Sequence, residues 1–324
     1  MNQTNLFYTI ISILLFDFLF YSYLTFLNNK RFDDKIPEKL ADVYDEEAYK
    51  KSQAYKKENA KFSTITSLFS MSVTMLFFFL AGFKFVDDLA RNFTNNPILV
   101  ALLFFGIILL GSDILTTPFS YYQTFVIEEK FGFNKSTKKI FWTDKLKGWL
   151  MSIILGGGIL SIIMLFYQYS GADFWIYTWV LIAVFTVFMN LFYAKLIVPI
   201  FNKQTPLGEG ELKTAIENYA QKVGFTLQNI FVIDGSKRST KANAYFSGFG
   251  SQKRITLYDT LINDLETEEI VAVLAHEVGH YKRKHIIFNL IVSLLLTGFM
   301  LYLVSLFISS PLLSSALSVS IPSF

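Results

Sequence analysis

The chain has 324 residues, a formal net charge of +3 and no cysteine. Hydrophobic residues make up 52% of it and charged residues only 17%, which is a low charged fraction for a protein whose whole surface faces water. These values exclude disorder, disulfide frameworks, thiolate metal sites and cysteine nucleophiles, and the small net charge argues against nucleic-acid binding.

Six apolar runs approach the roughly 20 residues that a helix needs to cross a bilayer. They cover residues 6–26, 67–85, 97–115, 149–167, 175–200 and 286–309. No Lys or Arg precedes the first run and no small-residue cleavage site follows it, so we interpret it as a mature helix rather than a signal peptide. The runs predict an integral membrane protein embedded in the lipid bilayer, and a large buried core is the alternative.

The loops between these runs differ in their content of lysine and arginine. The loops after the first and third runs are strongly basic, the loop after the second has only Arg91, with Lys84 at the helix edge, and the loop after the fourth has none. Because basic loops stay in the cytosol, residues 201–285 are expected to face the cytosol. Asp17 and Asp113 fall inside predicted spans, where they either face a polar interior or lie near a span end.

The composition changes between the fifth and sixth runs. Pro and Gly in 202–210 predict a linker, and apolar residues at helical spacing predict a helix over 211–223. Strands are expected at 229–233, 244–249 and 254–258, the last two joined through residues 250–252 as a hairpin. Thr267 is expected to cap the helix that follows. This pattern predicts an N-terminal membrane domain over 1–200, a soluble domain over 201–285, and a sixth span with an apolar tail over 286–324.

The three histidines, His276, His280 and His285, lie close together at the end of that soluble segment. The first two form the pattern H-E-x-x-H, and at about 100° per residue they project from nearly the same helix face. Two imidazoles one turn apart can bind one Zn²⁺, and Glu277 beside them can take a proton from a metal-activated water. A helix with two surface histidines is the alternative to this metalloprotease site.

His285 follows His276 by nine positions, so on a continuous helix it points about 180° away from the pair. The longer metzincin pattern does not fit, because Ile286 occupies the position of its third histidine. A carboxylate is therefore expected as the third ligand. His285 is expected to support a metal-binding residue or to lie at an interface, and a role as a metal ligand is the alternative.

Several segments together resemble the type I CAAX prenyl endopeptidases, which are integral-membrane zinc proteases of the gluzincin group. The matching segments are IPE at 36–38, KSQAY at 51–55, FVIEEKFGFN at 125–134, DGSKRS at 234–239, NAYF at 243–246 and AHEVGH at 275–280. The heat-shock membrane proteases share the zinc motif, but they have fewer helices before the catalytic domain.

The resemblance implies an all-α membrane protein, a multi-helix barrel around a water-filled chamber, with a small cytosolic α+β zincin-like catalytic insert. It implies a peptide substrate with a prenylated CAAX C-terminus or another membrane-associated peptide. Asn243, Ala244 and Tyr245 would belong to a strand that pairs with the extended substrate, and Asn243 would bind a substrate carbonyl. The alternative for Asn243 is a turn residue at a strand end. A bacterial inner membrane and the endoplasmic reticulum both fit the topology.

The family pattern also places a third zinc ligand, a Glu, well downstream of H-E-x-x-H, whereas this sequence has no carboxylate after Glu277. We therefore expect that the chain is a C-terminally truncated form, that the ligand lies beyond residue 324, and that the chain alone binds zinc poorly and is inactive. Glu209, Glu211 and Glu217 are weaker candidates for that ligand. The competing functions are a non-catalytic substrate-binding or quality-control protein on a protease-like scaffold, and a transporter.

Overall fold

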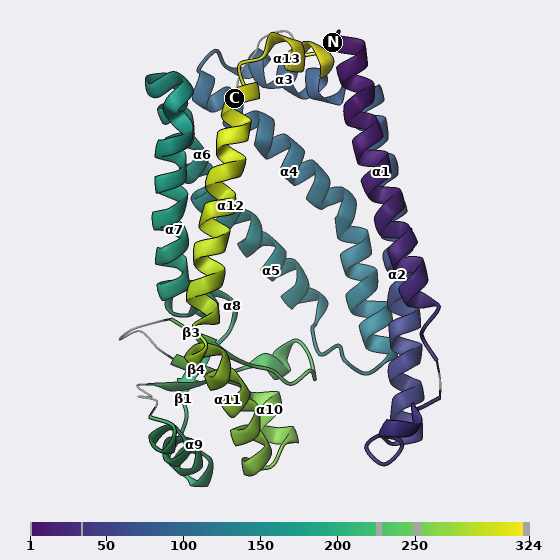
Figure 1. Cartoon of the computed structure of the whole chain (residues 1–324), viewed down its shortest axis with the longest axis vertical. Coiled ribbons are helices and arrows are strands. Elements are labelled where there is room, and N and C mark those ends of the chain that lie inside the picture. The colour runs from purple at the N-terminus through teal and green to yellow at the C-terminus, as the bar shows by residue number, and fades with distance from the viewer. Residues whose placement is uncertain (1, 34, 225–228, 249–253, 320–324) are drawn as a thin grey trace. The chain divides into compact units, whose positions relative to one another are not determined.

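The computed structural model describes residues 2–33, 35–224, 229–248 and 254–319, and most of them are helical (Figure 1). The chain divides into two compact units, Met1–Phe131 with Leu306–Phe324 and Gly132–Ser305. Among the described residues, five helical segments are long and apolar enough to cross a membrane. They are Gln3–Asn29, Glu46–Phe79, Pro97–Glu128, Lys138–Phe201 and His285–Phe307.

The fourth of these segments contains two of the apolar runs. Its 64 residues reverse direction near Gly171, which has a φ of 54°. Phe166 and Tyr177 on the two sides of this bend have ring centroids 5.7 Å apart. The five segments therefore account for all six runs, with 149–167 and 175–200 forming one helical hairpin.

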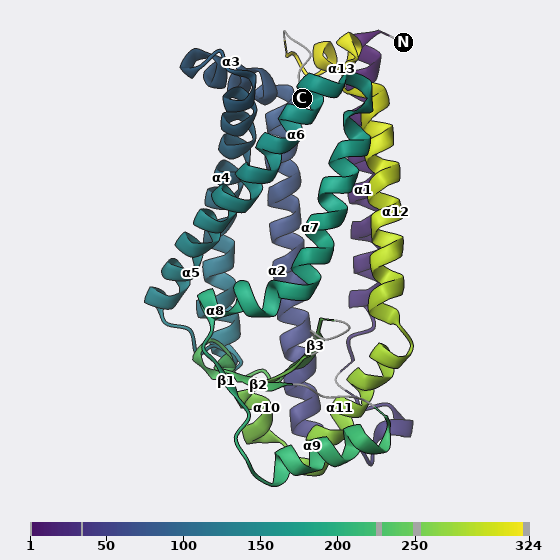
Figure 2. The same ribbon diagram turned by 90° about the vertical axis from the view of Figure 1, so that its left-hand side faces the viewer.

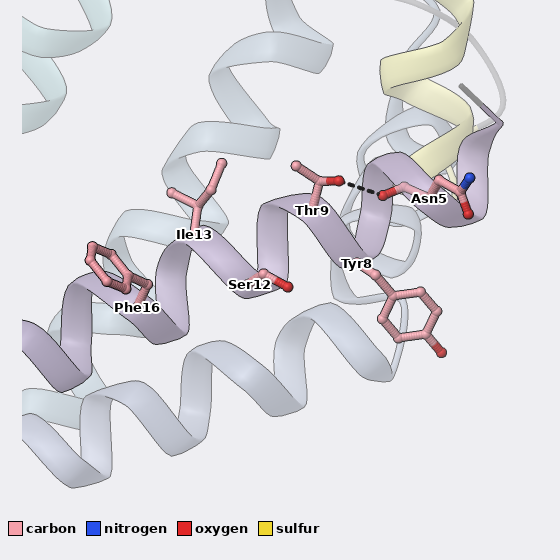
Figure 3. A pocket seen from close by; sticks show the side chains of 6 residues that line it. All are labelled: Asn5, Tyr8, Thr9, Ser12, Ile13 and Phe16. Carbon is pink, nitrogen blue, oxygen red and sulfur yellow. Dashed lines mark hydrogen bonds between the residues drawn. The ribbon is translucent and has the colours of Figure 1, made fainter.

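The first unit is made of helices α1 (Gln3–Asn29), α2 (Glu46–Phe79), α3 (Gly82–Phe93) and α4 (Pro97–Tyr122), the π-helical turn η2 (Gln123–Glu128), the short turn η1 (Glu38–Leu40), and α13 (Pro311–Ala316). Asp45 caps α2 by accepting a hydrogen bond from the Ala48 amide at 2.8 Å. Helix α2 extends far into the basic segment that the sequence suggested to be a loop. A depression on the outer surface of α1 is lined by that helix alone (Figure 3).

One sequence-based boundary in this unit is wrong. The second run was expected to continue to residue 85, but α2 ends at Phe79 and Ala81 adopts a left-handed conformation with a φ of 53°. Residues 82–93 form a separate amphipathic helix, whose buried side contains Val86 and Ala90. Asp17 lies in the middle of α1, so the interpretation of this residue as a helix-end position is disfavoured.

Two of the segments that carry the family resemblance meet within this unit. The Tyr55 hydroxyl on α2 donates a hydrogen bond of 2.5 Å to Glu128 on η2. Gln123 extends this contact through a 2.8 Å hydrogen bond to Asn59. Polar side chains thus join the N-terminal half of α2 to η2 at the end of α4.

The second unit begins with the helical segment α5 (Lys138–Met151), η3 (Ser152–Gly156) and α6 (Gly157–Ser170), then returns through η4 (Gly171–Asp173), α7 (Phe174–Leu196) and α8 (Val198–Phe201). Helix α12 (His285–Phe307) follows the soluble insert and rises beside α7 (Figure 2). The indole of Trp179 on α7 donates to the Leu294 carbonyl of α12 at 2.8 Å, and a Cβ on the buried Gly298 would lie 3.0 Å from the same ring.

The insert contains a four-stranded sheet in the order β1-β2-β4-β3. Its strands are β1 (Gln204–Pro206), β2 (Ile230–Ile233), β3 (Ala244–Ser247) and β4 (Arg254–Tyr258). Strands β2 and β4 pair in parallel, and β3 pairs antiparallel with β4 in the register Ala244↔Leu257. The three expected strands are confirmed, and the expected turn at 250–252 lies outside the described residues. The linker prediction for 202–210 is wrong in part, because β1 pairs with β2 at the sheet edge, where Pro206 is tolerated.

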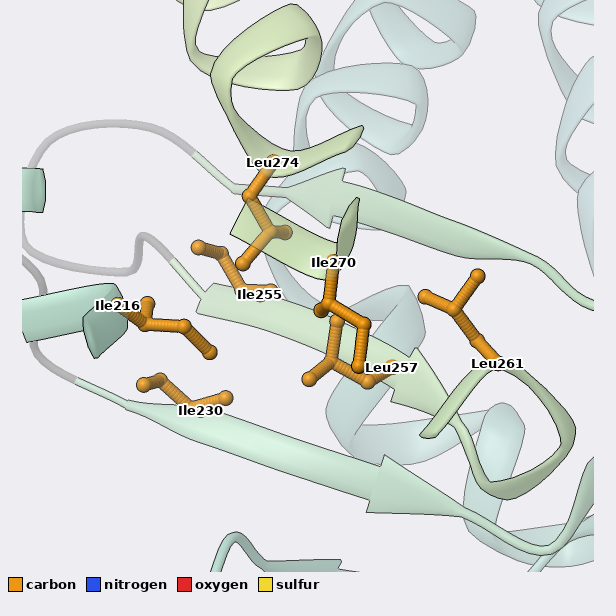
Figure 4. Close-up of a cluster of buried hydrophobic side chains, with 7 residues drawn as sticks. All are labelled: Ile216, Ile230, Ile255, Leu257, Leu261, Ile270 and Leu274. Atoms are coloured by element: carbon orange, nitrogen blue, oxygen red, sulfur yellow. The ribbon is translucent and has the colours of Figure 1, made fainter. Parts of the chain in front are cut away.

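Three helices pack on one face of this sheet, namely α9 (Glu211–Lys222), α10 (Asp259–Asp264) and α11 (Thr267–Lys282). The core between them consists of Ile216, Ile230, Ile255, Leu257, Leu261, Ile270 and Leu274 (Figure 4). The expected helix over 211–223 is confirmed. The cap of α11 is Glu266 rather than Thr267, since Glu266 and Glu269 form a capping box in which Glu269 accepts the Glu266 amide at 2.9 Å.

Candidate metal and peptide site

Helix α11 presents its histidines because of the side on which it is buried. Ile270, Leu274 and Val278 recur every four residues and are buried, which fixes one face of the helix against the insert core. His276 and His280 lie two residues from these positions, on the opposite, exposed face. Glu277 is half-buried between the two faces.

The two exposed imidazoles converge. The Nε2 atoms of His276 and His280 are 3.0 Å apart, and the ring planes are inclined by 72°. Two ligands at 2.0–2.1 Å from a tetrahedral zinc ion would be separated by about 3.3 Å. The pair therefore fits a single small divalent cation with only a slight opening of the side chains.

His285 lies beside this pair, and the assumption of a continuous helix through it is wrong. Helix α11 ends at Lys282, Lys284 adopts a left-handed conformation with a φ of 56°, and α12 begins at His285. This turn brings the Nδ1 atom of His285 to 2.8 Å from the Nδ1 atom of His280. The contact is with the edge of the His280 ring that faces away from His276.

The part of the chain that the structure describes holds no group of three or more His, Cys, Asp or Glu side chains arranged to bind a metal. The glutamates considered as a third ligand, Glu209, Glu211 and Glu217, do not complete such a group. Glu209 forms an ion pair with Lys213 on α9, and Glu217 lies 3.9 Å from the same ammonium. Two imidazoles are thus the metal-binding set within the described residues.

Strand β3 is the sheet edge that lies beside α11. Phe246 packs on Tyr281 of α11 with ring centroids 5.0 Å apart, and both contact the buried Val278. Strand β3 pairs with β4 on one side, and no other described strand pairs with its second edge. The backbone groups along that edge are therefore available to an extended peptide.

The three residues expected to bind substrate differ in their surroundings. Asn243 is exposed, and its Oδ1 atom accepts the Ala244 amide at 2.9 Å. Ala244 packs against the insert core. Tyr245 points to the opposite face of the sheet, where burial raises the pKa of its phenol. A direct side-chain contact with substrate thus fits Asn243 better than Tyr245.

That opposite face contains a buried arginine that sequence reasoning did not identify. Arg254 donates to the Ala194 carbonyl at 3.1 Å and to Gln204 at 3.0 Å, and its guanidinium lies 3.7 Å above the Phe231 ring. Burial lowers the pKa of Arg254 from its ordinary value. An arginine at the start of a strand has no spacing signal, so only the fold shows that it joins the sheet to α7.

Two more segments of the family resemblance meet beside the sheet. Arg238 of the DGSKRS segment binds Asp144 of α5 and also donates to the Phe201 carbonyl at 2.8 Å. The amide of Lys135 donates to the Arg238 carbonyl at 3.0 Å, and Asn134 forms a bridge with Ser239. These contacts hold the insert against α5 and α8.

Comparison with known proteins shows the family to which the chain belongs. Residues 25–203 match the family model described as CAAX prenyl protease N-terminal, five membrane helices, and residues 206–318 match peptidase family M48. The chain belongs to the CAAX prenyl protease branch of peptidase family M48. The five membrane-length helical segments and this family membership together show a multi-pass integral membrane protein.

Individual members of the CAAX prenyl protease family are similar over most of the chain. CAAX prenyl protease 1 of Saccharomyces cerevisiae is 38% identical over 304 residues, which are 90% of this chain and 66% of that protein. The homologue of Dictyostelium discoideum is 38% identical over 87% of this chain and 68% of its own length, and that of Homo sapiens is 31% identical over 87% and 70%. The chain spans about two thirds of the length of these relatives.

A solved structure of the same family has the same fold. The crystal structure of S. mikatae Ste24p superimposes with a TM-score of 0.89 and 36% identity, covering 94% of this chain and 73% of that one. The fold class expected from the sequence, a multi-helix membrane protein with a small α+β insert, is confirmed. The roles of His276, Glu277, His280 and the β3 residues stay predictions.

Proposed function

We propose that the chain carries the zinc site and substrate strand of a membrane metalloendopeptidase that cleaves CAAX-type or other membrane-associated peptides. The observation that carries this proposal is the 3.0 Å approach of the His276 and His280 Nε2 atoms on the helix that follows an open sheet edge. Because the chain belongs to a peptidase family, a metal site is a better interpretation of this geometry than a helix with two unrelated surface histidines.

The two imidazoles are the residues that would hold zinc. Both are exposed and one helical turn apart, and neutral imidazole nitrogen is a preferred zinc ligand. When bound, zinc would polarise the scissile carbonyl and acidify water at the site. Glu277 is one residue from His276 and half-buried, so its carboxylate is held beside the pair and is suited to accept the proton of the attacking water.

The substrate backbone would be held by strand β3. Alternate residues of an edge strand direct their main-chain groups outward. An extended peptide on the open edge would therefore bond to the Ala244 carbonyl and to Phe246, whatever its side chains are, while the main chain of Tyr245 pairs with β4. The side-chain amide of Asn243 would donate to a substrate carbonyl at the end of that strand. The printed names of the relatives, CAAX prenyl protease 1, support a peptide with a C-terminal CAAX sequence.

The insert would lie on the cytosolic side of the membrane. Nucleic acid would have no part in the function. Basic residues concentrate in the loops after the first and third apolar runs, and the alternation of the loops supports an insert over 201–285 on the same side as those two loops. We retain the division into a membrane domain over 1–200, this insert, and a sixth span with its tail over 286–324.

The complete site would need one more ligand than the described residues supply. Removing one protein ligand from a three-ligand catalytic zinc site leaves the ion weakly held. We therefore propose that this chain by itself binds zinc weakly and hydrolyses peptide slowly or not at all, and that a glutamate outside it completes the site.

The test measures hydrolysis of a prenylated CAAX peptide in detergent or liposomes, by this chain and by a longer form that extends it with a family C-terminal segment. The longer form should hydrolyse the peptide, lose activity with a chelator, regain it with zinc, and lose it in Glu277→Gln. Peptide binding that survives chelation, without hydrolysis in either form, would contradict the proposal and support a non-catalytic binding protein. Robust hydrolysis by this chain alone would contradict the proposed third ligand.

A further inference from the structure

His285 contacts the ring of a proposed zinc ligand from the side opposite the proposed ion. The distance between the Nδ1 atoms of His285 and His280 is 2.8 Å, which is a hydrogen-bond length. The ring planes of these two residues are inclined by 72° and the centroids are 4.9 Å apart. His285 is exposed, so no packing against a core explains why it adopts this position.

The geometry excludes His285 as a third ligand of the same ion. The two nitrogens of an imidazole direct their lone pairs or protons away from each other across the ring. His280 faces His276 with Nε2 and faces His285 with Nδ1. An ion between the Nε2 atoms is therefore separated from His285 by the His280 ring itself.

The contact couples the tautomers of His280 and His285. A neutral imidazole has one N–H donor and one acceptor, so a bond between two Nδ1 atoms needs one donor and one acceptor. If His280 donates through Nδ1–H, its Nε2 atom keeps the lone pair that a metal requires. Metal-binding histidines in general donate their other ring N–H to an acceptor that orients the ring.

We propose that His285 is a positioning residue that accepts the Nδ1–H of His280 and thereby holds its Nε2 lone pair toward the metal. This inference rests on the proposed zinc site, and it adds a residue that the H-E-x-x-H pattern does not contain. The backbone brings His285 into position, because the left-handed conformation of Lys284 turns the chain between α11 and α12 and places His285 beside the last turn of α11.

A first measurement reads the tautomer without any metal. The chain has only three histidines, so ¹⁵N-histidine labelling gives three imidazole signals, which His276→Asn and His280→Asn assign. In its neutral form, His280 should carry its proton at Nδ1 in the wild-type chain. It should lose that preference in His285→Leu and keep it in His285→Asn, because the Asn Oδ1 atom takes the place of the Nδ1 acceptor.

A second measurement reads zinc affinity by competition with a chromogenic chelator, using the whole chain in detergent. Loss of such an orienting acceptor commonly weakens metal binding by about 10–100-fold. His285→Leu should show that loss, His285→Asn should recover to within a few-fold of wild type, and the thermal midpoint of the metal-free chain should be the same in all three. That pattern separates positioning from a general role in folding.

The outcomes distinguish this inference from the proposed function. Equal zinc affinity in wild type and His285→Leu would overturn the inference while the zinc site stands. Equal loss in the Leu and Asn variants would also overturn it, because it would indicate a direct ligand. Zinc affinity that stays at the wild-type value in His276→Asn and His280→Asn, while wild-type His280 still shows the His285-dependent tautomer, would overturn the zinc site and leave the hydrogen-bond assignment intact.

Discussion

Arg238 binds Asp144 through two hydrogen bonds, from its Nε atom at 2.8 Å and from its Nη2 atom at 3.0 Å. The first residue belongs to the loop after β2 and the second to α5, so this pair joins the soluble insert to a helix of the membrane part of the same unit. Both side chains are only about a quarter exposed, at 24% and 26%. The planar guanidinium is suited to such a two-point contact, and a lysine is not.

Replacement of this arginine should destabilise the insert. Hydrogen bonds to charged groups contribute about 1.5–3 kcal/mol each when partly buried, so Arg238→Ala should lower the unfolding free energy by at least that amount. Arg238→Lys should lose most of it as well. The measurement is the thermal midpoint in detergent, with the exposed neighbour Lys237→Ala as the matched control, which should stay at the wild-type value. A thermal midpoint of Arg238→Ala equal to that of wild type would show that the Arg238–Asp144 pair contributes nothing to stability.

Gly235 should not tolerate a methyl group. A Cβ on this buried glycine would lie 2.3 Å from the Tyr258 ring, which is closer than van der Waals contact allows. Gly235→Ala should therefore displace the end of β4 and cost about 1–3 kcal/mol, the usual range for overpacking. Gly208→Ala is the control, because no atom lies within 4 Å of its added Cβ. Equal stability of the two variants would contradict the close packing of Tyr258.

Tyr245 should make the insert sensitive to alkaline pH. Burial raises the pKa of its phenol, so the folded state keeps the proton above the ordinary value of about 10 while the unfolded state releases it. The stability of the folded state is then intact below about pH 10 and falls as the pH rises toward the folded-state pKa. Tyr245→Phe should reduce this loss, as measured by urea unfolding between about pH 9 and 11, and the exposed Tyr44→Phe should not.

The turn at Lys284 should respond to backbone strain. A non-glycine residue in the left-handed region costs about 1–2 kcal/mol, so Lys284→Gly should be as stable as wild type or more stable. A β-branched residue tolerates this conformation poorly. Lys284→Val should therefore lower the thermal midpoint and also separate His285 from His280, which ¹⁵N-histidine signals would report. An unchanged spectrum in Lys284→Val would contradict the role of this turn.

The sequence predicted the parts of the fold that repeat a pattern. Long apolar runs, a helix with Ile270, Leu274 and Val278 at regular spacing, and alternating strand residues all produce periodic signals, and each of these elements is present. The H-E-x-x-H spacing likewise predicted the convergence of His276 and His280, because four residues are close to one helical turn.

The features that the sequence did not reveal depend on single backbone angles or on contacts between distant segments. The turns at Ala81 and Lys284 have positive φ without glycine, so no composition signal marks them. Strand β1 is three residues long and contains Pro206, and it becomes a strand only because β2 offers it an edge. The position of His285 followed from such a turn, which is why helical spacing placed it on the wrong side.

The central claim is that His276 and His280 together bind one zinc ion beside Glu277. Its most direct test is the zinc content of the purified chain, equilibrated with saturating free zinc and measured for wild type, His276→Ala, His280→Ala and Glu277→Gln. The account predicts one zinc ion per chain in wild type and Glu277→Gln, and loss of that ion in each histidine variant. Zinc content in either histidine variant equal to that of wild type would contradict it.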